Sequence, residues 1–148
     1  MTRSELDKLL KSGPSKSELF QGTPLAFPAD YRILVVDDIS INCRILSQLL
    51  VQLGATSVRT ALSGEDACRL AAEQPPSIVL MDLQMPGMNG PELLTRLRAG
   101  GLPSDVPVVG VTAEDRPERL FDVSGFHQIM SKPVTLQKLY DLFRGLLG

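Results

Sequence analysis

The sequence predicts an α/β protein built on a doubly wound, five-stranded parallel sheet with strand order 2-1-3-4-5. Three short, continuous apolar runs, at 33–36, 78–81 and 106–111, are typical of strands buried on both faces of such a sheet. Two more polar segments, at 57–61 and 128–131, suit edge strands. Because segments with helical spacing separate the strands, helices are expected on both faces of the sheet.

The expected helices are placed by the residues at their ends. Helices begin well at a polar cap or a Gly-Pro pair, and they end at glycine or before proline. On these signals, helices are expected over 41–53, 63–74, 90–99 and 135–146.

The chain is expected to divide after residue 30. Glycine and proline break any regular pattern within residues 1–30, which we interpret as an N-terminal extension with at most one short helix, over 4–10. Residues 31–148 are expected to form one folded domain. The sequence leaves open whether three apolar residues of the extension dock on that domain: Leu19, Phe20 and Phe27.

Composition argues against several classes of function. Apolar residues make up 43% of the chain and charged residues 22%, as in soluble globular proteins. The net charge is −2 and Lys and Arg form no cluster, so no nucleic-acid partner is expected. There is no membrane-length apolar run and no signal sequence, so a cytoplasmic protein without membrane contact is expected. Cys43 and Cys68 lack motif spacing and are expected to be reduced packing thiols.

Five polar residues end or follow the predicted strands: Asp37, Asp38, Asp82, Thr112 and Lys132. Since ligands bind beyond the carboxyl ends of the strands in an open parallel sheet, we expect these side chains to meet at one edge. Crowded carboxylates repel one another unless a cation or a proton intervenes, and an open, oxygen-only site favours Mg²⁺. A carboxylate can also act as a nucleophile and form an aspartyl phosphate, with Mg²⁺, Lys132 and Thr112 neutralising the phosphoryl oxygens.

Each of these residues also has a purely structural interpretation. Taken alone, Asp37 or Asp38 is best explained as a helix cap, Thr112 as a turn residue and Lys132 as a solvated surface lysine. Asp82 fits such an explanation poorly, because it follows a buried apolar run and a lone buried carboxylate is costly. The coincidence of all five at the ends of four strands therefore favours a functional site.

Four segments closely resemble the receiver domains of two-component response regulators. They are 33–38 (ILVVDD), 78–90 (IVLMDLQMPGMNG), 108–113 (VVGVTA) and 131–133 (SKP). The acidic pair followed by Asn42 is most similar to receivers attached to hybrid histidine kinases. Such domains have the flavodoxin-like strand order, in agreement with the order predicted from the strand pattern.

The resemblance implies a Mg²⁺ site. Asp38, Asp82 and the backbone carbonyl of Gln84 would ligate the ion, and Asp37 would hold a metal-bound water. These assignments follow from the positions that the residues occupy in the matching motifs.

The resemblance also implies a signalling role rather than an enzymatic one. Asp82 would be the phosphoacceptor, Lys132 would pair with the phosphoryl oxygens, and Thr112 would hydrogen-bond the phosphoryl group and report its arrival. The chain has no phosphate-binding loop for ATP, so the donor would be a histidine kinase or a histidine phosphotransfer protein. Output would pass to a downstream protein target, and the only catalysis would be self-phosphorylation and slow autodephosphorylation.

Two features depart from the family pattern. Receivers usually have Tyr or Phe three residues before the lysine, where this chain has Ile129, and Phe126 falls on the opposite strand parity. The segment 113–125, expected to form the fourth helix of the fold, is short and contains Pro117. We therefore hypothesise that phosphorylation occurs but that the usual switch from the threonine to an aromatic residue is altered.

The sequence also bears on three rival functions. A hydrolase of the haloacid-dehalogenase pattern needs a second aspartate where this chain has Gln84, although Gln84 and Glu114 are well placed to tune autodephosphorylation. The main alternative is a pseudo-receiver, a phosphorylation-independent interaction module, but no acceptor, acidic residue or lysine is missing here. A flavin site is disfavoured, because the acidic first turn would repel a phosphate. His127 is expected to have a surface or structural role.

Overall fold

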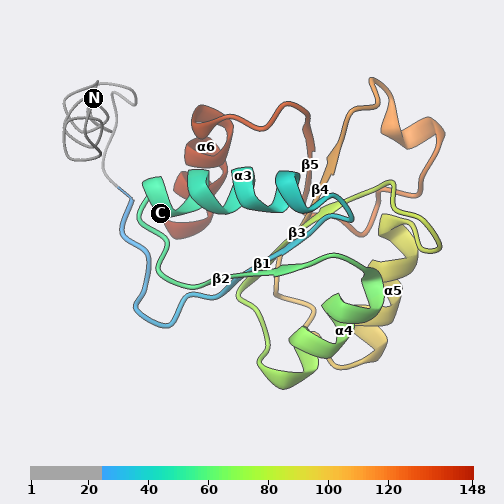
Figure 1. The fold of residues 1–148 in the computed structure, drawn as a ribbon, viewed down its shortest axis with the longest axis horizontal. Coiled ribbons are helices and arrows are strands. Elements are labelled where there is room, and N and C mark those ends of the chain that lie inside the picture. The colour runs from blue at the N-terminus through green and yellow to red at the C-terminus, as the bar shows by residue number, and fades with distance from the viewer. Residues whose placement is uncertain (1–24) are drawn as a thin grey trace, which may run out of the picture.

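The structure, a computed structural model, describes residues 25–148 and has a parallel sheet at its centre. The strand order is β2-β1-β3-β4-β5, which confirms the prediction (Figure 1). The strands are β1 (Ile33–Val36), β2 (Val58–Ala61), β3 (Ile78–Asp82), β4 (Val108–Thr112) and β5 (Gln128–Ser131). Their register brings the carboxyl ends together: Val36 lies opposite both Ala61 and Met81, and Thr112 lies opposite Ser131.

Within residues 25–148, two α-helices cover each face of the sheet. They are α3 (Ser40–Gln52), α4 (Gly64–Glu73), α5 (Gly90–Ala99) and α6 (Leu136–Leu147). Helices α3 and α6 lie on one face and α4 and α5 on the other (Figure 1). Alternate residues of β1 enter the two cores, since Ile33 and Val35 belong to the first and Leu34 and Val36 to the second. Within the described residues, none of these helices has the length and apolarity to cross a bilayer.

The helix starts follow the expected local chemistry. The hydroxyl of Ser63 accepts a hydrogen bond from the Asp66 backbone N–H (3.1 Å), and the hydroxyl of Thr135 accepts one from Lys138 N–H (3.2 Å). At α5 the Asn89 side chain caps the helix, which then begins with Gly90-Pro91 as the sequence predicts.

The helix expected between 113 and 125 is not formed, and this prediction was wrong. The helical structure of this segment is limited to the 3₁₀ turn η1 (Pro117–Arg119). Arg116 has φ −132° and ψ 72°, outside the helical region, because a following proline ring disfavours helical backbone. Pro117 also has no N–H with which to continue a helical ladder. One consequence is that Leu120, which a helix could have turned inward, is 58% exposed.

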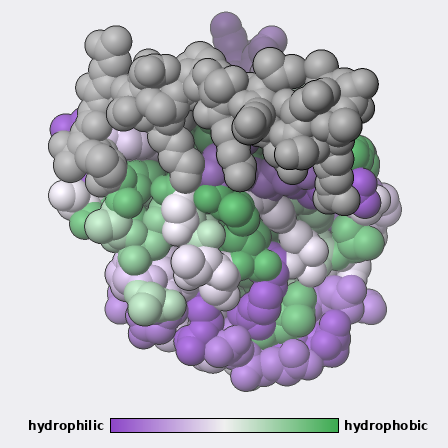
Figure 2. Space-filling model, turned by 60° about the vertical axis from the view of Figure 1, so that its left-hand side comes forward, coloured by the Kyte–Doolittle hydropathy of each residue, from purple (hydrophilic) through white to green (hydrophobic). Residues whose placement is uncertain are grey.

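The residues just before β1 pack against the domain. The ring of Phe27 lies 5.2 Å from the ring of Phe143 on α6 and 5.6 Å from that of Tyr31, measured between centroids. Leu25 contacts the same core. Figure 2, which brings forward the left-hand side of Figure 1, shows hydrophobic side chains gathered across the middle of this end of the molecule. Phe27, whose docking the sequence left open, therefore contacts the core.

The remaining expectations for the extension concern residues beyond those the structure describes. The short helix over 4–10 and the docking of Leu19 and Phe20 lie outside residues 25–148. The boundary at residue 31 stays a prediction.

Candidate functional site

The polar residues singled out by the sequence stand at the carboxyl edge of the sheet. Asp37 and Asp38 directly follow β1, Asp82 and Thr112 end β3 and β4, and Lys132 directly follows β5. Because all five strands are parallel and paired in register, their ends deliver these side chains to one edge.

Three carboxylates lie together at this edge. Asp37, Asp38 and Asp82 each offer an oxygen atom, and these atoms all lie within 4.8 Å of one another. Asp37 and Asp82 are each only 7% exposed, and Asp38 is half-buried. Like charges at this separation, partly shielded from water, repel one another strongly. The arrangement therefore calls for a cation.

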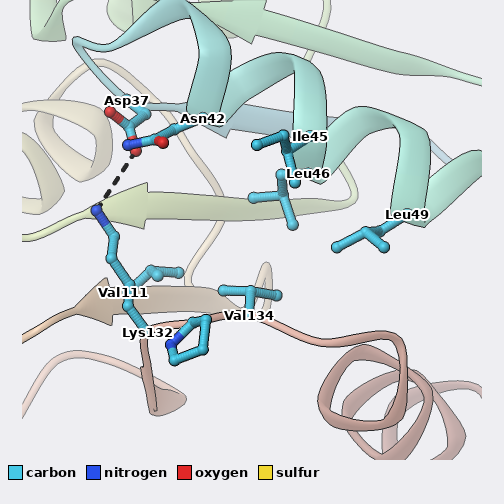
Figure 3. A pocket seen from close by; sticks show the side chains of 9 residues that line it. Asp37, Asn42, Ile45, Leu46, Leu49, Val111, Lys132 and Val134 are labelled. Atoms are coloured by element: carbon cyan, nitrogen blue, oxygen red, sulfur yellow. Dashed lines mark ion pairs between the residues drawn. The ribbon is translucent and has the colours of Figure 1, made fainter.

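Lys132 supplies part of the compensating charge. Its Nζ atom donates to Oδ2 of Asp82 at 3.1 Å and lies 3.7 Å from Oδ2 of Asp37, an ion pair visible in Figure 3. One ammonium can balance only one of the three negative charges, so two remain. The Lys132 side chain is 28% exposed, which leaves the site open to solvent on its side.

Backbone hydrogen bonds hold the site side chains in their turns. Oδ1 of Asp37 accepts from the Ile39 N–H (2.9 Å) and Oδ1 of Asp82 accepts from the Gln84 N–H (3.0 Å). Oγ1 of Thr112, a buried side chain, accepts from the N–H two residues further on (3.1 Å). The interpretation of Thr112 as a turn residue therefore agrees with the structure. The interpretation of Asp37 or Asp38 as the cap of the following helix is wrong, because Ile39 is the N-cap of α3 and no side chain caps it.

Beside Asp82, the exposed side chain of Gln84 contacts the half-buried side chain of Glu114. Nε2 of Gln84 donates to Oε1 of Glu114 at 3.4 Å, which links the turn after β3 to the turn after β4. The predicted role of these two residues in tuning autodephosphorylation stays a prediction.

The cysteine nearest the site has a structural explanation. Cys43 is buried, and its Sγ atom donates to the backbone oxygen of Asp37 at 3.4 Å. Burial, and then the negative charge of Asp37, raise the pKa of this thiol. Cys43 is thus held as a neutral packing group, and both Cys43 and Cys68 are free thiols, as expected.

Ile129 and Phe126, the two side chains on which the predicted change of the threonine-to-aromatic switch depends, lie in different places. Gly110 of β4 lies opposite Ile129 of β5, and Ile129 Cδ1 is 2.8 Å from the point where a Cβ on Gly110 would stand. Phe126 instead reaches toward Gly90, with its ring tip 3.4 Å from the equivalent point there. In this structure Phe126 therefore does not occupy the place beside Gly110.

Lys138 is a polar group of this region that the sequence patterns had not indicated. It lies in the first turn of α6, and its Nζ atom donates to oxygen atoms of the segment 131–133 around Lys132. The available signal was its position three residues after the Thr135 cap, where Glu or Gln is the common choice.

Comparison with known families settles the class of protein. The family model described as response regulator receiver domain matches residues 33–144, which include all of the candidate site. This chain belongs to the response regulator receiver family. Receiver domains are signalling domains of two-component systems, not classical enzymes.

Individual relatives of this receiver domain agree with that assignment. It is 43% identical over 113 residues to the sensor histidine kinase RcsC of Salmonella typhi, covering 74% of this chain but only 12% of the kinase. The receiver domain of the sensor histidine kinase PA1611 of Pseudomonas aeruginosa PAO1 has a TM-score of 0.72 and 25% identity, with 81% of this chain and 99% of that one covered. Its structure contains a magnesium ion coordinated in the active site cleft.

A third relative was solved with its partner. The receiver domain of the response regulator Ssk1 of Saccharomyces cerevisiae, in complex with the histidine phosphotransfer protein Ypd1, has a TM-score of 0.68 and 27% identity. The match covers 80% of this chain and 89% of that one. Receiver domains thus interact with histidine phosphotransfer proteins, as this complex illustrates.

Proposed function

We propose that this receiver domain accepts a phosphoryl group on Asp82 from a phosphohistidine of a partner protein, in a Mg²⁺-dependent reaction that alters its protein contacts. The observation that carries the proposal is that the Asp82 carboxylate lies close to those of two further aspartates and 3.1 Å from the ammonium of Lys132. Because a phosphohistidine is formed from ATP, we propose that the phosphoryl transfer takes place in the cytoplasm. We also infer that the downstream target is a protein.

The donor set fits Mg²⁺. It consists of oxygen atoms only, and the two negative charges that Lys132 leaves unbalanced match a divalent cation. Asp38, Asp82 and the backbone carbonyl of Gln84 would hold the ion, with Asp37 completing the acidic set. The ion would supply positive charge beside the phosphoryl oxygens during transfer.

The transfer itself is a displacement at phosphorus. A carboxylate oxygen of Asp82 attacks, a P–O bond forms, and the P–N bond to the donor imidazole breaks. The imidazole leaves with the electron pair of that bond, and one proton from solvent restores the neutral ring. Lys132 would move its ion pair from the free carboxylate to the phosphoryl oxygens, and the Thr112 hydroxyl would hydrogen-bond the same group.

A groove beside the site supports a protein partner as the donor. It has a volume of about 420 Å³ and runs from Asp37 and Lys132 along α3 (Figure 3). Apolar side chains line much of it: Ile45, Leu46, Leu49, Val111 and Val134. An apolar wall that ends at the phosphorylation site is suited to a helix presenting a phosphohistidine, which would pack its own apolar face there. We propose a histidine kinase or a histidine phosphotransfer protein as that partner.

We further propose that the response to phosphorylation is altered in this domain. Ile129 fills the space against Gly110 where the family usually has an aromatic residue, and η1 replaces most of the fourth helix. We expect the segment 113–125 to change conformation, because β5 (Gln128–Ser131) contains no aromatic side chain that could rotate. Chemical-shift comparison of the free protein with its beryllofluoride complex tests this: the largest changes beyond the site should fall in 113–125. Rotation of an aromatic side chain into the space beside Thr112 would contradict it.

The proposed chemistry is tested by incubating the chain with acetyl phosphate and measuring its intact mass. With Mg²⁺ we expect one added phosphoryl group, released by hydroxylamine as acyl phosphates are, and with excess EDTA we expect none. Circular dichroism should show the same fold in both samples, so that the pair isolates the metal dependence. A chain that gains no phosphoryl group under either condition would favour the phosphorylation-independent interaction module instead.

A further inference from the structure

The first turn of α6 contains a charge that its position disfavours. Thr135 caps the helix, and Lys138 occupies the third position after it, where a glutamate or glutamine would complete a capping box. A cation at a helix N-terminus is opposed by the helix dipole, and the first turn contains no acidic residue to offset it. Departures from local preference of this kind concentrate at functional positions.

The structure shows what holds this charge in place. Nζ of Lys138 donates to the backbone oxygen of Ser131 (2.8 Å), to the hydroxyl of Ser131 (3.1 Å) and to the backbone oxygen of Pro133 (2.9 Å). An ammonium has three donor hydrogens, so all three donate to the segment 131–133. Lys138 forms no ion pair with any carboxylate of residues 25–148.

Both backbone acceptors belong to the neighbours of Lys132. Ser131 precedes Lys132 and Pro133 follows it, so the hydrogen bonds of Lys138 hold the backbone on either side of the site lysine. The N–H of Lys132 is itself fixed, since it donates to the backbone oxygen of Thr112 at 2.8 Å. The backbone from which the Lys132 side chain extends to Asp82 is therefore restrained at three successive residues.

We propose that Lys138 is a positioning residue for phosphoryl transfer, which holds the backbone of Lys132 so that its ammonium meets the phosphoryl oxygens. This inference rests on the proposed function, because it concerns the same reaction. Stabilisation of developing charge depends on groups that are fixed before the reaction, and small displacements of such groups lower the rate steeply. Lys138 touches neither Asp82 nor the carboxylates that would hold Mg²⁺, so it acts through Lys132 alone.

The test compares rates of phosphorylation by acetyl phosphate at saturating Mg²⁺ for the full chain and its variants. Lys138→Met keeps the length of the side chain but removes all three hydrogen bonds, and we expect a rate about 10-fold lower, the usual cost of losing a group that orients a ligand. Lys138→Arg, which retains donors, should recover part of the rate. Gln137→Met, the same kind of change one residue earlier on an exposed position, should react as the unmodified chain does.

A double-mutant comparison separates positioning from a general structural effect. In a Lys132→Ala background, Lys138→Met should cause no further loss, because the group it orients is absent. A 10-fold loss that persists in that background, or a Lys138→Met chain that reacts at the unmodified rate, would overturn the proposal. If the unmodified chain takes up no phosphoryl group, the proposed function itself fails, and that outcome is distinct from both.

Discussion

Asparagine in place of Asp82 should remove phosphoryl uptake from acetyl phosphate, with a rate lower by at least about 10³-fold, the scale seen when a nucleophile is removed. The amide oxygen carries no negative charge and forms no stable acyl phosphate. The substitution also removes the ion pair with Lys132 at 3.1 Å, so the ammonium is left with Asp37 at 3.7 Å. Intact mass spectrometry of the treated variant checks the expectation.

The matched control is Asp105→Asn. Asp105 is exposed and lies just before β4, at the opposite end of the strand from Thr112, so this variant should be phosphorylated as the unmodified chain is. Circular dichroism should show that both variants are folded. Phosphoryl uptake that survives in a folded Asp82→Asn chain would mean that another residue is the acceptor.

Alanine in place of Phe143 should lower the free energy of unfolding by about 3–5 kcal/mol, the range found when a buried phenylalanine is truncated. The Phe143 side chain is fully buried, and its ring packs at edge-to-face angles against those of Phe27 (5.2 Å) and Tyr31 (6.2 Å). Its loss would leave a cavity where α6, the residues before β1 and the sheet meet. Urea unfolding followed by circular dichroism measures the change.

A companion variant tests how far the folded unit extends. Phe27→Ala truncates the partner ring from the segment before β1, and we expect it to cost about 1–2 kcal/mol, since Phe27 is half-buried. Phe121→Ala is the control: the same change at a half-buried site in the segment around η1, where we expect less than about 1 kcal/mol. A Phe27→Ala chain with unchanged stability would place residues 25–30 outside the cooperative unit.

Much of the fold could be predicted because strand burial and helix capping both leave a signature in the local sequence. The four residues of β1 are buried on both faces, so they form a continuous apolar run, whereas the partly exposed β2 is more polar. Ser63 and Thr135 mark helix starts because their side chains satisfy backbone N–H groups that the helix cannot. Strand order then followed from the central position of the apolar strands.

The residues of the site could be predicted from the sequence for a related reason. In a parallel sheet, every strand end points to the same edge, so the order of elements alone brings Asp82 and Lys132 together although 50 residues separate them. The distances between the site atoms and their hydrogen-bond partners could not be predicted. The sequence of the first turn of α6 does not indicate that Lys138 contacts Ser131 and Pro133. That contact depends on the backbone path between β5 and α6.

Two features escaped prediction because they depend on context. The expectation of a helix in 113–125 came from the family, and one proline with a shortened connection overrode it. The docking of Phe27 depends on a place beside Phe143 that exists only after α6 has packed on the sheet. Contacts of this kind, between segments far apart in the chain, have no local signature.

The distance along the chain between Asp82 and Lys132 has a consequence for biosynthesis. A nascent polypeptide leaving the ribosome contains all three carboxylates once residue 82 has been made, but it lacks the ammonium for another 50 residues. Until β5 docks on the edge of β4, three like charges have no counter-charge from Lys132 at their edge of the sheet. Synthesis therefore delivers the acceptor before its counter-charge, and the charge pair forms only when the last strand completes the sheet.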